Sequence, residues 1–174
     1  MGKEVSFRPD QFIVSKTDKR GIIQYVNQAF MDVSGFVEDE LIGKPHSVIR
    51  NAMMPRCIFK FFWDNIKQGK EFFAYVVNEC KNGDYYWVLA YVTPDRDPQT
   101  GEINGFFSVR RVPSSHAITQ ISSLYAALCA EEAKHSSKVK GMEAGERMFM
   151  TALDKMGVDY HELVYGLENG EITL

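Results

Sequence analysis

A mixed segment at residues 40–55 holds the side chains of this sequence that are best suited to chemistry. It reads ELIGKPHSVIRNAMMP, so that Gly and Pro punctuation and apolar residues surround one His and one Arg, and Trp63 and Asn78 follow it. An aromatic ring, an amide that both donates and accepts, and a cation are typical of a pocket for a planar ligand. No Ser-His-Asp arrangement, phosphate loop or metal-ligand spacing accompanies them in the sequence. We therefore expect a binding site and no enzymatic activity.

Two of these residues occupy positions where their type needs a reason. Trp63 falls with Phe59 and Phe62 on the apolar face of a helix pattern, where it packs either in the core or against the ring of a ligand. Asn78 falls in a strand pattern, where Asn is depleted. Its amide either contacts a ligand or bonds to a neighbouring turn. The residue types alone leave both pairs of alternatives open.

Three further polar residues are candidates for the same site. Arg50 follows two apolar residues and could pair with phosphate through its planar fork of donors, or form a surface salt bridge. His46 could be a hydrogen-bonded pocket residue or an axial ligand of haem iron. Asn27 closes a strand and could either lie near a ligand or cap the next helix.

The bulk composition points to one globular core with a helical extension. The chain has 174 residues, of which 45% are hydrophobic, and a net charge of -3, which leaves no excess of positive charge for nucleic acid. No apolar stretch approaches the roughly 18 to 20 residues that span a bilayer, and the first residues lack an apolar signal core. We expect a cytoplasmic protein. The three cysteines are too far apart for a disulfide framework or a zinc site.

The order of strand and helix patterns predicts an α+β fold. Apolar and β-branched patterns predict five strands, at residues 12–17, 22–27, 72–81, 84–93 and 103–112, with 94–101 as a loop and Asn82-Gly83 as a hairpin turn. Helix patterns lie between the second and third strands, at 28–34, 37–41 and from Pro55 to Gly69. This order predicts a five-stranded antiparallel sheet with short helices on one face.

The C-terminal third of the sequence predicts helices only. One helix begins at Ser114 or Ser115, a second covers 143–156, and a third begins near Asp159. We therefore divide the chain into an N-terminal cap (1–11), an α+β domain (12–113) and a C-terminal helical extension (114–174).

Several motifs make the α+β domain resemble a PAS sensor domain, and in particular the PAS domain of the Aer-type aerotaxis receptors. The general PAS pattern is carried by Asn27, Gly35, Glu40-x-x-Gly43, Asn82-Gly83 and Trp87. The closer match is carried by Pro45-His46-x-x-Ile49-Arg50-x-x-x-Met54-Pro55, by Trp63, and by Val77-Asn78-x-x-Lys81-Asn82-Gly83-Asp84-x-Tyr86-Trp87-Val88. The resemblance implies a PAS fold that binds FAD non-covalently.

The resemblance also implies roles for the candidate residues. It places Trp63, Arg50 and Asn27 near the flavin, and an amide at Asn78 could donate to the oxidised ring and accept from the reduced one. The His and Asp that follow the Arg in the family are here Asn51, which can still donate, and Met53, which cannot replace a carboxylate. Light-sensing LOV relatives carry a reactive Cys at the position of His46, so a cysteinyl-flavin adduct is not expected.

These implications combine into one expected function with two alternatives. We expect a redox or oxygen sensor for energy taxis that binds FAD, forms a homodimer, and signals to a separate membrane-bound chemoreceptor-like protein. A haem-binding PAS gas sensor, with His46 as the iron ligand, is the first alternative. A cofactor-free PAS module that dimerises through its apolar C-terminal helix is the second.

Overall fold

A computed structural model describes residues 2–174, and their contacts form two compact units. Unit 1 contains the residues up to Asn51 and Asn65–Val112, whereas unit 2 contains Ala52–Asp64 and Pro113–Leu174. The C-terminal residues thus form one unit with a short segment from the middle of the chain. Nothing in the sequence pattern indicates this long-range association.

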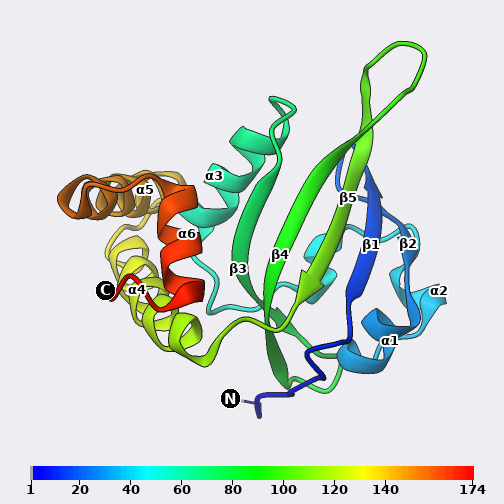
Figure 1. Ribbon diagram of the computed structural model, residues 1–174, viewed down its shortest axis with the longest axis horizontal. Coiled ribbons are helices and arrows are strands. Elements are labelled where there is room, and N and C mark those ends of the chain that lie inside the picture. The colour runs from blue at the N-terminus through cyan, green and yellow to red at the C-terminus, as the bar shows by residue number, and fades with distance from the viewer. Residues whose placement is uncertain (1) are drawn as a thin grey trace. The chain divides into compact units, whose positions relative to one another are not determined.

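Unit 1 is built on one antiparallel sheet of five strands (Figure 1). The strands are β1 (Ile13–Asp18), β2 (Ile23–Val26), β3 (Phe72–Glu79), β4 (Tyr85–Arg96) and β5 (Ile103–Arg111). Their order across the sheet is β2-β1-β5-β4-β3, and every neighbouring pair is antiparallel. The predicted α+β class and five-stranded antiparallel sheet are confirmed.

Strand β4 is longer than the sequence pattern predicts, because Pro94 lies inside it. Pro94 was expected to begin a loop, yet it pairs with Phe106 of β5. Strand β3 pairs with β4 only as far as Val92, so β5 alone flanks β4 at Pro94. Proline is tolerated there because its missing N–H is not needed on the unpaired side.

Two short helices and one 3-10 turn of unit 1 follow β2. They are α1 (Gln28–Ser34), α2 (Glu38–Leu41) and η1 (His46–Ile49), of which α1 packs against β1 and α2 against β2. The Asn27 side chain caps α1 by accepting from the Phe30 N–H, and Gly35 ends the helix with φ 74°. An N-cap Asn before the helix and a Gly after it are the local signals that predict a helix at 28–34.

Unit 2 is helical. It contains the residues of α3 (Arg56–Ile66) up to Asp64, followed by α4 (Ser115–Ala133), α5 (Lys138–Met156) and α6 (Tyr160–Asn169). Helix α5 begins earlier than the predicted 143 because Ser137 caps it, accepting from the Lys140 N–H. Along residues 2–174 no helix combines the length and apolar character needed to cross a membrane.

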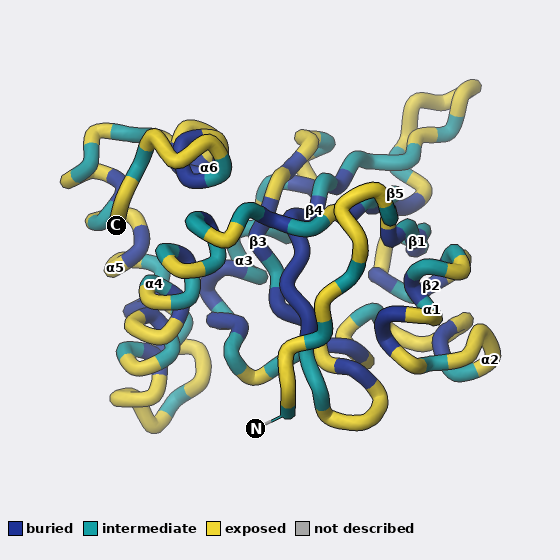
Figure 2. The backbone as a smooth tube through the Cα atoms, turned by 60° about the horizontal axis from the view of Figure 1, so that its bottom comes forward, coloured by how far each residue is buried: buried dark blue, intermediate teal, exposed yellow. Residues whose placement is uncertain are grey.

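The core of unit 2 is aromatic and aliphatic. Phe61 lies edge-on to Phe149 and Tyr160, with ring centroids 5.9 and 5.2 Å apart. Helix α4 contributes a buried stripe that alternates with exposed positions (Figure 2), and its largest apolar members are Ile121, Tyr125 and Leu128. The apolar stripe predicted for this helix therefore has partners within unit 2.

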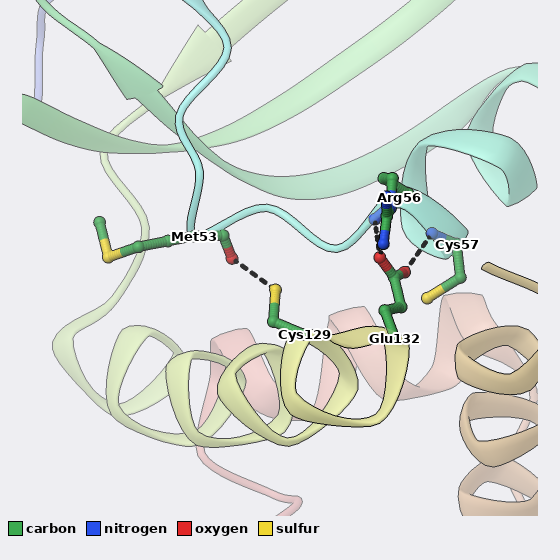
Figure 3. A network of polar contacts seen from close by, with 5 residues as sticks. All are labelled: Met53, Arg56, Cys57, Cys129 and Glu132. Carbon is green, nitrogen blue, oxygen red and sulfur yellow. Dashed lines mark hydrogen bonds and ion pairs between the residues drawn. The ribbon is translucent and has the colours of Figure 1, made fainter. Parts of the chain in front are cut away.

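A buried carboxylate holds the first turn of α3 to the end of α4 (Figure 3). Glu132, whose side chain is 4% exposed, accepts from Cys57 N at 2.8 Å and from Arg56 N and Nε at 3.2 and 2.9 Å. Burial favours the neutral acid, yet these hydrogen bonds leave the pKa of Glu132 below its usual value. Glu132 thus satisfies N–H groups that the start of a helix leaves without partners.

Two glycines of α5 allow this helix to approach the end of α4. A Cβ atom at Gly141 would lie 2.4 Å from the carbonyl oxygen of Glu132. A Cβ atom at Gly145 would lie 3.0 Å from both Cys57 Sγ and Glu132 Cγ. Larger side chains would separate α5 from the buried carboxylate, so these positions need glycine for close packing.

Candidate functional site

One face of the sheet in unit 1, called here the inner face, gathers buried polar side chains. They are Ser15 of β1, Asn78 of β3, Tyr86 of β4, and Ser108 and Arg110 of β5, none more than 6% exposed. Asn78 pairs with Tyr86, and Ser15 pairs with Ser108. Arg110 pairs with Ala90, four residues beyond Tyr86. Because paired residues and alternate residues of a strand point to the same side, all five side chains share this face.

Four polar atoms of the inner face make no hydrogen bond of standard geometry, although the side chains of the cross-strand neighbours Asn78 and Tyr86 interact with each other. They are Asn78 Nδ2, Tyr86 Oη, Ser108 Oγ and Arg110 Nη1. Leaving a buried polar group unsatisfied costs about 1–3 kcal/mol, and folded proteins contain few such groups. Four such atoms on one face could bond to a ligand with polar groups of its own.

Arg110 brings a positive charge to the inner face. Its Nη2 donates to Ser15 Oγ at 3.0 Å and to His46 Nε2 at 2.8 Å, and its guanidinium lies 5.8 Å from the centroid of the Phe30 ring. Burial lowers the pKa of Arg110 to about 10, which leaves it protonated at neutral pH. No Asp or Glu between residues 2 and 174 pairs with it.

His46 is a neutral, half-buried partner of Arg110. Burial, followed by the charge of Arg110, lowers the pKa of His46 to about 3. A guanidinium can only donate, so Nε2 of His46 accepts and the ring proton is assigned to Nδ1. In this arrangement Nε2 is engaged by Arg110, and a role for His46 in a ligand pocket stays a prediction.

Acidification should destabilise the protein through His46. The unfolded side chain has a pKa near 6.5 and the folded one near 3, so the unfolded state takes up the proton first as the pH falls. The free energy of unfolding is therefore expected to drop below pH 6.5, by at most about 1.4 kcal/mol per pH unit from this residue. Urea unfolding at successive pH values measures the drop. His46→Gln should flatten it, and an equal drop in both proteins would contradict this role.

The candidates Arg50 and Asn51 follow η1 directly. The backbone of Arg50 forms an isolated antiparallel bridge with Asn78, and its side chain is exposed. Asn51 is half-buried at the end of the same segment. The structure thus brings Arg50 and Asn78 together, although they lie far apart in the sequence.

Asn27 has a structural role in unit 1. Its Oδ1 accepts from Val14 N at 3.0 Å and from Phe30 N at 3.1 Å, and its Nδ2 donates to the Phe12 carbonyl at 2.8 Å. The side chain joins β1 to the start of α1. This is the capping alternative, and a contact with a cofactor stays a prediction.

Trp63 lies in the part of α3 that belongs to unit 2. Its side chain is half-buried, and its ring is edge-on to Phe62 with centroids 5.5 Å apart. The predicted helix and its aromatic face are present. A role for Trp63 in binding a ligand stays a prediction.

Sequence reasoning missed the polar residues of β5. It placed a strand at 103–112 but gave no function to Ser108 or Arg110, and it named Tyr86 only as part of a motif. A signal exists, since Phe106, Ser108 and Arg110 occupy alternate positions and therefore one side of the strand. What the sequence does not contain is the register that sets Ser15 and Ala90 beside them.

Residues 2–174 contain neither a cluster of metal-ligand side chains nor a disulfide. Residues 2–174 contain no group of three or more His, Cys, Asp or Glu side chains that could hold a metal ion. Cys57, Cys80 and Cys129 are free thiols. Burial raises the pKa of Cys80 to about 11, so this thiol is protonated and unreactive at neutral pH.

Several curated proteins resemble this chain in sequence. The aerotaxis receptor of Escherichia coli (strain K12) is 36% identical over 121 residues, which are 70% of this chain and 24% of the receptor. The nitrogen fixation regulatory protein of Klebsiella pneumoniae is 28% identical over 98 residues, which are 56% of this chain and 20% of that protein. The chain therefore spans a quarter or less of the length of these relatives.

Solved structures share the fold. The light state structure of the blue-light photoreceptor Aureochrome1 LOV superposes with a TM-score of 0.52 at 20% identity, covering 67% of this chain and 88% of that one. A structure described as "Flavin Analogue Sheds Light on Light-Oxygen-Voltage Domain Mechanism" gives a TM-score of 0.54 at 18% identity, covering 71% and 87%. At these identities the likeness concerns the fold alone.

The family assignment rests on a match that covers more than half of the chain. A family model described as "PAS domain" matches residues 9–110, which include all five strands of the sheet except the last residue of β5. The 36% identity to the aerotaxis receptor is consistent with this match. The chain belongs to the PAS domain family.

Proposed function

We propose that the inner face of unit 1 binds FAD non-covalently and that the redox state of the flavin is the signal this PAS domain reports. The observation that carries the proposal is the set of four buried polar atoms on one face that make no hydrogen bond of standard geometry. The resemblance of the segments around Arg50 and Asn78 to the Aer-type PAS domains supports the same ligand.

The residues of the inner face fit the polar edge of a flavin. The isoalloxazine ring presents carbonyl oxygens and ring nitrogens, which need both donors and acceptors. The Asn78 amide and the Tyr86 and Ser108 hydroxyls can act as either, and Arg110 donates. Arg50, whose planar guanidinium can donate two parallel hydrogen bonds, is suited to the pyrophosphate of FAD.

Asn78 is suited to distinguish the two redox states. FAD, when bound, supplies reversible electron transfer, and reduction turns a ring nitrogen from an acceptor into a donor. The Nδ2 of Asn78 can donate to the oxidised form, and after rotation of the amide its Oδ1 can accept from the reduced form. If the oxidised and the reduced flavin bind differently to two conformations of the protein, reduction shifts the balance between those conformations. Switching requires no more than this difference.

The signal would leave through the strands that carry these residues. Asn78 belongs to β3, which pairs along its whole length with β4, and β4 pairs with β5. Helix α4 follows β5 in the chain, and we propose that it conveys the change to a separate membrane-bound chemoreceptor-like partner. In this proposal the protein is a cytoplasmic homodimer without catalytic turnover.

Titration with FAD, FMN and riboflavin tests the proposal. Quenching of flavin fluorescence should show one FAD bound per chain, with FAD binding more tightly than riboflavin, which lacks the pyrophosphate. Arg50→Gln should reduce this preference and leave riboflavin binding unchanged. Equal weak binding of all three flavins would overturn the proposal. A sharp haem absorption band in the purified protein would favour the gas-sensor alternative.

A further inference from the structure

Arg110 is a buried cation whose charge nothing in the described chain balances. It is 5% exposed, and its neighbours within hydrogen-bond distance, Ser15 and His46, are neutral. An ionised group in a protein interior is normally paired, because an unpaired buried charge costs several kcal/mol. Its Nη1 is in addition without a hydrogen-bond partner. Both features indicate that a negative charge reaches Arg110 from outside the described residues.

The titratable groups that face Arg110 cannot supply this charge. His46 of η1 is neutral and becomes positive on protonation. Tyr86 of β4 is the other titratable group that acts on Arg110, and burial raises its pKa well above the usual range in spite of the nearby cation. Tyr86 is therefore a neutral phenol at physiological pH. The remaining contacts of Arg110 are the Ser15 hydroxyl and the Phe30 ring.

We propose, building on FAD as the ligand, that Arg110 balances the negative charge of the reduced flavin, so that the protein stabilises the anionic reduced form. In this reaction the ring takes two electrons from an external donor, which is dithionite in the assay, and one proton, which bonds to a ring nitrogen. A second ring nitrogen stays unprotonated and carries the negative charge. Without Arg110, a second proton would be taken from water to neutralise that charge.

This role makes the proton count of reduction measurable. For a two-electron couple, a tenfold change in the equilibrium constant corresponds to about 30 mV. Uptake of one proton therefore shifts the midpoint potential by about 30 mV per pH unit, and uptake of two protons by about 60 mV. A fixed cation beside the ring also raises the midpoint potential, since charge near the ring nitrogens tunes a flavin.

The experiment is a potentiometric titration of the FAD-loaded full chain at several pH values between 6 and 8. It gives the midpoint potential and the change in that potential per pH unit. Arg110→Met removes the charge and keeps the stem, and Arg110→Lys keeps a charge. Arg111→Met is the matched control, because Arg111 is the next residue of β5, points to the opposite face and is exposed. Urea unfolding of each variant without FAD, together with the FAD content, shows that the chain is folded and loaded.

The wild type, Arg110→Lys and Arg111→Met should share the one-proton slope. Arg110→Met should lower the midpoint potential by an amount equivalent to a tenfold to hundredfold change, roughly 30 to 60 mV, and should steepen the slope toward the two-proton value. An unchanged midpoint potential and pH slope in a loaded Arg110→Met protein would overturn the role of Arg110 and leave FAD binding intact. If that variant does not fold, the wild type alone decides, because a wild-type pH slope that corresponds to uptake of two protons would also overturn the role of Arg110. A wild-type chain that binds no FAD overturns the proposed function as well.

Discussion

Replacing Glu132 with Ala is expected to lower the free energy of unfolding by about 3 kcal/mol. The carboxylate is buried and accepts from two backbone N–H groups, those of Arg56 and Cys57, and from the Arg56 guanidinium. Its removal leaves the start of α3 uncapped and opens a hole beside Gly145, whose Cα lies against the Glu132 side chain. Equilibrium unfolding in urea measures the loss.

Glu131 offers the matched control for this prediction. It precedes Glu132 on α4, and it pairs at the surface with Lys134. Exposed ion pairs contribute about 0–1 kcal/mol, so Glu131→Ala should have a small effect. Glu132→Gln should lie between the two, since it keeps an acceptor and loses the charge. Equal losses for Glu131→Ala and Glu132→Ala would contradict a capping role for Glu132.

Replacing Asn78 with Ala is expected to weaken FAD binding about thirtyfold, equivalent to about 2 kcal/mol. Asn78 is 3% exposed, and its Nδ2 makes no hydrogen bond of standard geometry within the protein, so it can donate to the ligand. Ala removes this donor and leaves a ring nitrogen of the flavin unsatisfied. The dissociation constant from fluorescence quenching measures the effect.

Asn78→Ala should also remove the response to reduction. In the wild type we expect dithionite to change amide hydrogen exchange in β3 and β4, because the Asn78 amide rotates between donating and accepting. With excess FAD, the variant should stay loaded and lose this change. Glu79→Ala is the control, because Glu79 is exposed on the opposite face of β3. A response that survives in Asn78→Ala would remove Asn78 from the switch.

Local signals in the sequence predicted much of the fold. Helix α1 has the predicted bounds, since Asn27 and Gly35 punctuate it in the chain itself. The Asn82-Gly83 turn joins β3 to β4, and Gly83 has φ 86°, which glycine adopts without strain. These features depend on neighbouring residues only, so the sequence contains the information that determines them.

The parts that the sequence did not predict depend on residues far apart in the chain. Glu132 caps a helix that begins 76 residues earlier, and no local pattern links the two. Arg110 donates a hydrogen bond to Ser15, which lies 95 residues earlier, and the register of β1 and β5 brings the two side chains together. Asn78 and Arg50, in contrast, are candidates on residue type and resemblance, because an amide in a strand and a cation among apolar residues are locally unusual.

The central claim is that the inner face of unit 1 holds FAD. The most direct test is the visible absorption spectrum of the full chain after incubation with excess FAD and removal of free ligand, with the released chromophore identified by its mass. The account predicts a yellow protein with the two-banded spectrum of a bound flavin, one FAD per chain, and bleaching by dithionite that air reverses. A colourless protein that retains no FAD would contradict it.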